Sequence, residues 1–298
     1  MSLLNQASDG ISSILIVIFK LLSYEKRKLT RENIVNLCAP GGAFSQARVR
    51  QTLNTWRDLG MFEETETAVT FHSDVRRDER NIESLPTLAR RLVLCGENNR
   101  DLWASEEALS ADFTRAMCWL LAQDVWAVET SGWDDAELLL QKQTQDSKEW
   151  IQNDTRWNGL KTWARFLGFG WTSGKSTFVV DPTEAVRVAL PRVFGKKKTM
   201  AATDFIPALA ENLPVLDGGP YREEIELRLA EKTGPDAWRP PPKGQISTSL
   251  SRALSRMIGS GILSIETRAD AEFEHIQMTG RNGTALSKPI SHLTFHQL

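Results

Sequence analysis

The sequence is poor in the residues that build metal sites and disulfide frameworks. It contains three cysteines and four histidines among 298 residues. Cys38, Cys95 and Cys118 are odd in number and widely spaced, and they form neither a CxxC pair nor a Cys/His cluster with zinc-site spacing. The histidines show no HExxH motif. We therefore expect no metal, reduced thiols and a cytoplasmic location.

The sequence also lacks the common catalytic signatures. It has no nucleophile elbow, glycine-rich dinucleotide fingerprint or paired-carboxylate motif. Residues 170–176 resemble a phosphate-binding loop, but its spacing would require glycine where Phe169 stands. We interpret this segment as a hairpin turn with Gly174 at a position of positive φ. The sequence thus predicts that the protein is not an enzyme and has no cofactor.

No long apolar run and no excess of basic charge are present. Residues 11–22 are apolar but too short to span a bilayer, so they predict a buried first helix rather than a signal peptide, and no membrane partner. The formal net charge is -2, from 36 basic and 38 acidic side chains. Any contact with DNA must therefore depend on local basic patches.

A repeated pattern is present instead. Residues 44–60 predict a helix that ends at Gly60, and residues 61–72 then alternate like a hairpin. Residues 247–261 and 262–278 repeat this pattern near the other end of the chain. Apolar positions coincide at a constant offset, with Val49, Leu53 and Trp56 matching Leu250, Leu254 and Met257. Residues 162–168 and 169–181 form a looser third copy.

The segments before these copies predict further helices. Residues 11–24 and 30–38 precede the first copy, with Thr30 as N-cap, Asn33 at the capping-box position and Ser45 as cap of the next helix. Residues 203–213 and 221–232 precede the last copy. Helix, helix, turn, helix and hairpin is the order of a winged helix.

The predicted fold is mainly α with small β-hairpin wings, in which tandem winged-helix units flank a helical middle domain rich in tryptophan. Eight of the ten tryptophans lie between Trp103 and Trp171. The predicted domains are residues 1–76, 77–200 and 201–298, the last including a tail. A winged-helix-like unit is possible at about residues 154–195.

The third helix of a winged helix can lie in the major groove, so its outward face indicates the candidate DNA contacts. Amide side chains can pair with adenine, and arginine with guanine or phosphate. The first unit places Gln51, Asn54 and Thr55 outward, flanked by Arg48 and Arg50. The last unit places Arg252, Ser255 and Arg256 outward. The basic run of Lys196, Lys197 and Lys198 is a candidate for phosphate contacts.

Two observations weaken this interpretation. Any solvated helix face is polar. For the looser middle copy, which places Asn158, Lys161 and Arg165 outward, we favour this simpler explanation because its aromatic surroundings suggest burial. Acidic residues also lie in the predicted wings, among them Glu63, Glu64 and Glu66, and carboxylates repel phosphate. The alternatives are a structural adaptor that binds proteins and a transcription regulator.

Three segments resemble the DpdG family: the opening residues 1–10 before an apolar helix, Thr-Trp-Ala-Arg-Phe-Leu-Gly-Phe at 162–169, and Val-Asp-Pro-Thr at 180–183. The resemblance implies an accessory role in bacterial gene clusters that insert 7-deazaguanine derivatives into DNA and restrict unmodified DNA. It transfers no catalytic residues. We therefore expect a DNA-binding or DNA-positioning subunit, with double-stranded DNA and proteins of a modification or anti-phage defence complex as partners.

Overall fold

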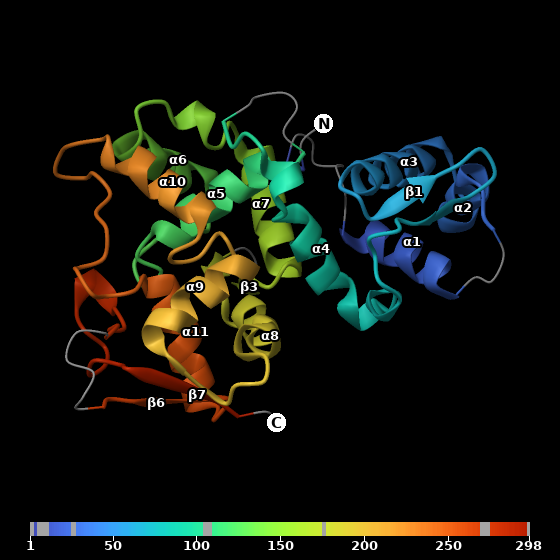
Figure 1. Cartoon of the computed structure of the whole chain (residues 1–298). Helices are drawn as coiled ribbons and strands as arrows, with labels where there is room; N and C mark the ends of the chain where they lie inside the picture. Colours follow the sequence, from blue (N-terminus) through green and yellow to red (C-terminus); the bar gives the residue numbers. More distant parts are fainter. Residues whose placement is uncertain are drawn as a thin grey trace. The chain divides into compact units, whose positions relative to one another are not determined.

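The computed structural model describes residues 3–4, 12–24, 28–103, 109–174, 177–268 and 275–296. The protein is about 53% helical, with eleven α-helices and only small antiparallel sheets in this part of the chain, which confirms a mainly α protein with small β elements. The chain forms two compact units: Met1–Thr114 with Asn153–Leu167, and Arg115–Gln152 with Gly168–Leu298 (Figure 1). The boundaries predicted at residues 76 and 200 do not coincide with this division.

The first unit begins with three helices and a hairpin in the predicted order. They are α1 (Ser12–Tyr24), α2 (Arg31–Cys38), α3 (Ala43–Asp58), β1 (Phe62–Glu64) and β2 (Val69–Phe71). Leu29, before α2, forms an antiparallel bridge with Val69 and adds a short third edge to the hairpin. Helices α4 (Leu85–Val93) and α7 (Asp154–Phe166) complete the regular α-structure of this unit.

A local side-chain cap explains where α2 begins, but α3 begins without one. The Thr30 hydroxyl accepts a hydrogen bond from the Asn33 backbone, and the Asn33 side chain accepts one from the Thr30 backbone, so the predicted capping box starts α2. The cap predicted at Ser45 is wrong. Helix α3 begins at Ala43, and Gly42, with φ 144°, occupies the N-cap without a side-chain hydrogen bond.

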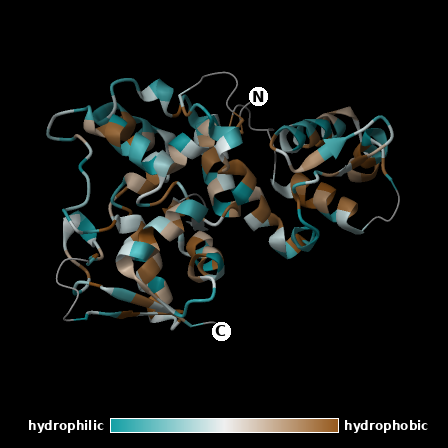
Figure 2. Cartoon of the chain, in the orientation of Figure 1, coloured by the Kyte–Doolittle hydropathy of each residue, from teal (hydrophilic) through white to brown (hydrophobic). Residues whose placement is uncertain are grey.

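The core of the first unit is aliphatic and aromatic. Helix α1 is brown along much of its length in Figure 2, and its Leu15, Ile18 and Phe19 are buried. The Phe19 ring packs edge-on against Phe71 of β2, with centroids 5.0 Å apart. Trp56 of α3 lies 5.4 Å from Trp163 of α7. These contacts fix the orientation of α3 in its unit.

The second unit contains most of α5 (Ala111–Ala122) and all later elements except α7. Its helices and strands are α6 (Trp133–Gln143), β3 (Gly170–Ser173), β4 (Thr177–Val180), α8 (Thr183–Phe194), β5 (Thr199–Ala201), α9 (Ala202–Asn212), α10 (Pro220–Ala230), α11 (Thr248–Gly259), β6 (Leu263–Glu266) and β7 (His292–Phe295). The predicted hairpin at residues 169–181 is confirmed, because β3 pairs with β4 and Gly174 has a φ of 60°.

The three-stranded sheet of the second unit differs from the expected hairpin of residues 262–278. Strand β6 pairs with β7 from the tail, and β7 pairs with β5 on its other side, so the strand order is β5-β7-β6. Residues 269–274, within the predicted hairpin, lie outside the described residues. In this arrangement Leu293 of β7 pairs with Met200 of β5 and Ile265 of β6 and is fully buried.

Glycine ends the helix in each copy of the repeat. Gly60, Gly168 and Gly261 have φ values of 85°, 84° and 76°, a region that glycine enters without a Cβ penalty. The residue after the glycine then donates its backbone N–H back to the helix. Met61 donates to the Trp56 carbonyl of α3 at 2.8 Å, and Ile262 donates to the Met257 carbonyl of α11 at 2.9 Å. The same local closure thus turns both helices into their following strands.

Candidate nucleic-acid interface

Two arginines flank the predicted outward face of α3. Arg48 is exposed, and its guanidinium lies 4.3 Å from the ring centroid of Phe44, a side chain that is 70% exposed. Arg50 is half-buried and forms an ion pair with Glu32 of α2 at 2.8 Å. Arg48 therefore presents an open cation near the start of α3, whereas Arg50 would have to leave Glu32 to contact DNA.

The central residues of this face are less open than predicted. Thr55 is buried, and its hydroxyl donates to the Gln51 carbonyl at 3.1 Å. The outward position predicted for Thr55 is therefore wrong, because α3 buries threonines as well as its apolar stripe. Gln51 and Asn54 are half-buried. The Asn54 side-chain oxygen accepts a hydrogen bond from Arg31 at 2.9 Å, so it is already engaged.

Arg31 also neutralises one carboxylate of the hairpin. Its Nε and Nη2 donate to Glu64 at 2.7 and 2.5 Å, and Arg57 lies 3.6 Å from the same carboxylate. The hydrogen bond from Arg31 holds the pKa of Glu64 below its usual range, against the opposing effect of burial. Glu63 accepts a hydrogen bond from Thr70 on the paired strand at 3.1 Å. The acidic hairpin therefore carries less free charge than its composition indicates.

Helix α11 is covered at its start by its own unit. Thr248 and Ser249 are buried, and their hydroxyls donate to the carbonyls of Gln123 and Leu121 at 3.0 and 2.8 Å. A recognition helix contacts base edges mainly through its N-terminal residues. The first turn of α11 is therefore not open to a groove in this structure.

Arg252, predicted to point outward, instead connects three segments of the second unit. Its guanidinium donates to the carbonyls of Val180 and Val125 at 2.6 and 2.8 Å and lies 4.1 Å from the ring centroid of Trp126. Burial lowers the pKa of Arg252, while Asp181 opposes this shift. The predicted outward position is wrong, because the guanidinium satisfies two backbone acceptors. A DNA contact through Arg252 stays a prediction.

Asp181 joins a second arginine to a second tryptophan. Its Oδ2 lies 3.0 Å from Arg256 Nη1 and accepts a hydrogen bond from Trp171 Nε1 at 3.2 Å. Its Oδ1 accepts hydrogen bonds from the backbone and hydroxyl of Thr183, at the start of α8. The Asp181 side chain is buried, whereas that of Arg256 is 57% exposed. Arg256 thus keeps the outward position predicted for it.

The remaining predicted contacts are not brought together with these arginines by any interaction found among the described residues. Ser255 is half-buried, and its hydroxyl contacts the Met278 sulfur at 3.6 Å. Lys196, Lys197 and Lys198 are exposed in the connection between α8 and β5. The lysine run therefore remains a separate candidate for phosphate contacts.

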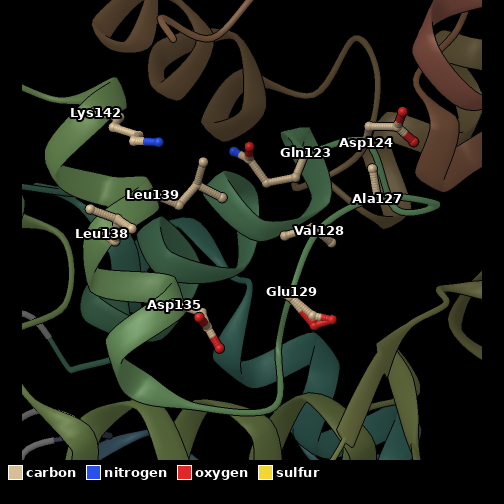
Figure 3. Close-up of a pocket in the computed structure, with 9 residues that line it drawn as sticks. All are labelled: Gln123, Asp124, Ala127, Val128, Glu129, Asp135, Leu138, Leu139 and Lys142. Carbon is tan, nitrogen blue, oxygen red and sulfur yellow. The ribbon is translucent and has the colours of Figure 1, made fainter.

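A surface cavity of about 340 Å³ also lies in the second unit. Figure 3 shows four lining residues from α6, Asp135, Leu138, Leu139 and Lys142, together with Gln123, Asp124, Ala127, Val128 and Glu129 from the segment that follows α5. Its acidic side chains, Asp124, Glu129 and Asp135, outnumber Lys142, so the cavity does not suit a phosphate backbone. No group of three or more metal-ligating side chains occurs among the described residues.

Sequence reasoning missed the group around Asp181. The density of tryptophan predicts only a buried aromatic domain, yet Trp126 and Trp171 are 41% and 44% exposed. The available signal was Trp171 in an alternating strand beside a hairpin turn. Nothing in the sequence spacing indicates that α11 brings Arg252 and Arg256 to these tryptophans.

Comparison with known families agrees with the resemblance found in the sequence. The family model described as DpdG-like matches residues 1–271. The chain belongs to the DpdG-like family. No curated protein and no solved structure matches it. Across the residues described in this DpdG-like protein, no helix has the length and apolar character needed to cross a membrane.

Proposed function

We propose that this DpdG-like protein is a non-enzymatic subunit that binds or positions DNA in a bacterial DNA-modification and anti-phage defence complex. Membership of the family suggests involvement in the Dpd 7-deazaguanine modification system. In this role the chain would hold the duplex while other proteins modify or cleave it. The absence of transferable catalytic residues in the family resemblance supports an accessory role.

We infer that both units contain a winged helix. Residues 12–71 supply three helices and a hairpin, extended by the bridge between Leu29 and Val69. In the second unit, α8, β5, α9, α11, β6 and β7 follow a winged-helix order, with α10 as an insertion and the sheet order β5-β7-β6. On this assignment the second winged helix begins at α8 rather than at residue 201.

The observation that carries the DNA proposal is the open cation on α3. Arg48 is exposed on the first turns of this helix, where helix-turn-helix proteins contact DNA. The hairpin carboxylate of Glu64 is paired with Arg31 of α2. The first unit is therefore better suited than α11 to approach a duplex.

Replacement of Arg48 by alanine tests this proposal. We expect Arg48→Ala to weaken binding to a labelled duplex roughly 5- to 100-fold if the contact is to a base, with a smaller loss for a phosphate contact. Fluorescence anisotropy with the full chain measures the change. Arg77→Ala is the matched control, because Arg77 is an exposed arginine of the same unit outside α3. Equal affinities for both variants and the unchanged protein would contradict a DNA contact by α3.

A second candidate function is a structural adaptor whose winged helices bind partner proteins. Exposed apolar side chains on α2 and α3 favour it, since Leu37 is 59% and Phe44 70% exposed. The engagement of Asn54 by Arg31 also favours it, because a base-reading amide would have to give up that bond. Stoichiometric partners that survive nuclease treatment, and are lost in Phe44→Ala but not in Arg48→Ala, would support the adaptor over the DNA subunit.

A further inference from the structure

Two tryptophan rings in the second unit are exposed while most of the described tryptophans are buried. Trp126 and Trp171 are 41% and 44% exposed. Six others lie in the cores of their units: Trp56, Trp119, Trp150, Trp157, Trp163 and Trp238. A tryptophan ring that stays in contact with water does not contribute the favourable free energy that the buried rings contribute to folding. The two exposed rings therefore call for a functional explanation.

Polar contacts hold both rings in place. The Arg252 guanidinium lies 4.1 Å from the centroid of the Trp126 ring and is itself fixed by two backbone carbonyls. Trp171 donates its Nε1–H to Asp181, the carboxylate that also pairs with Arg256. Because these bonds restrict the rings before any ligand arrives, a partner that stacks on them loses little side-chain entropy.

We propose that Trp126, Trp171, Arg252 and Arg256 form a stacking platform for the unpaired bases of single-stranded nucleic acid. The proposal rests on the DNA role proposed above and names a second substrate form, an opened strand. Sites for single strands combine aromatic rings, on which any base can stack, with cations that meet the backbone. Arg256 is the candidate for this contact: its Nη1 pairs with Asp181 at 3.0 Å, while 57% of its side-chain surface stays exposed to meet a phosphate.

The composition of the platform favours nucleic acid over a protein partner. Its four members are two aromatic rings and two guanidinium groups, and none is aliphatic. Tryptophan and arginine are also enriched in protein interfaces, but the core of such an interface is mostly apolar, whereas the platform contains no aliphatic side chain. Bases of an intact duplex are stacked inside the helix, so their faces are closed to these rings except at the ends. The platform is therefore predicted to prefer single strands, whereas the contact proposed for α3 is with a duplex.

The test compares a labelled polythymidine strand with a labelled blunt duplex, using the full chain and fluorescence anisotropy. We expect Trp126→Ala and Trp171→Ala each to weaken single-strand binding roughly 5- to 100-fold, from the stacking energy of one base. Duplex affinity should change less. Trp171→Phe keeps a ring and should retain most of the single-strand affinity. Leu227→Ala is the control, because Leu227 is 72% exposed on α10 and lies outside the platform.

The possible negative results distinguish the platform from the DNA proposal on which it rests. If duplex binding persists and both alanine variants bind the single strand like the unchanged protein, the platform is overturned while the DNA proposal stands. Equal losses for strand and duplex would overturn the preference for unpaired bases. If neither form binds, the DNA proposal and the platform both fall. Loss of a nuclease-resistant protein partner in the alanine variants, without loss of strand binding, would assign the surface to protein docking.

Discussion

At the scale of single residues, Arg31 links three elements of the first unit. It lies on α2, donates to Asn54 on α3 and pairs with Glu64 on β1. Both charged side chains are partly exposed, with 21% and 25% of their side-chain surface in contact with water. Hydrogen-bonded pairs of this kind contribute more than fully exposed ones. The position of the hairpin beside α3 therefore depends on this link.

Glu64→Gln tests the link through its pH dependence. The pKa of Glu64 is lowered in the folded protein, mainly by the hydrogen bond from Arg31. A lowered pKa stabilises the fold above the unfolded value of about 4.3, and this contribution is lost as pH falls through the folded value. We expect Glu64→Gln to cost about 1 kcal/mol near neutral pH. The difference from the unchanged protein should shrink in acid.

Thermal melting followed by circular dichroism, at neutral and at acidic pH, measures this effect. Glu66→Gln is the control, because Glu66 is exposed in the turn of the same hairpin. A destabilisation by Glu64→Gln that stays constant as the pH falls would show that the change acts through packing instead of charge.

At the scale of elements, glycine determines where α3 and α11 stop. Gly261 has a φ of 76°, and a Cβ there would meet nothing within 4 Å. Gly259 lies two residues earlier, inside α11, where an added Cβ would also meet nothing within 4 Å but φ is not positive. Because an added Cβ would meet no atom at either position, a difference between the two variants would come from the positive φ of Gly261 and not from a steric clash.

Gly261→Ala and Gly259→Ala are therefore predicted to act in opposite directions. The first forces alanine into the left-handed region and should destabilise the second unit by about 1–2 kcal/mol. The second replaces a helical glycine and should stabilise by about 0.5–1 kcal/mol. Chemical denaturation of the full chain measures both. A loss of stability in both variants would contradict the assignment of Gly261 as a conformational stop.

Local features were predictable because the chain encodes them within a few residues. The capping box at Thr30 and Asn33, the turn at Gly174 and the buried faces of α3 and α11 all follow from local patterns. Pairing of β6 with β7 and β5 was not predictable, because it joins residues far apart in the sequence. The contacts of Arg252 were unpredictable for the same reason, because its two carbonyl acceptors lie more than 70 residues away in the sequence.

At the scale of the whole molecule, the proposed contact with DNA requires a chain with a net charge of -2 to separate its charges locally. Ion pairs such as Arg31–Glu64 and Arg256–Asp181 neutralise carboxylates within each unit. Among the exposed cations are Arg48 on α3 and the lysine run of residues 196–198. The DpdG-like chain is thus predicted to bind DNA through a few phosphate contacts, as suits a subunit that acts together with other proteins.

The salt dependence of duplex binding tests this central claim most directly. Plotted as the logarithm of affinity against the logarithm of salt concentration, binding should fall with a slope of about 0.9 for each phosphate neutralised. For the full DpdG-like chain we predict a clear negative slope that becomes shallower by roughly one in Arg48→Ala if Arg48 meets a phosphate. An affinity that does not change with salt, or no measurable binding at low salt, would contradict the account.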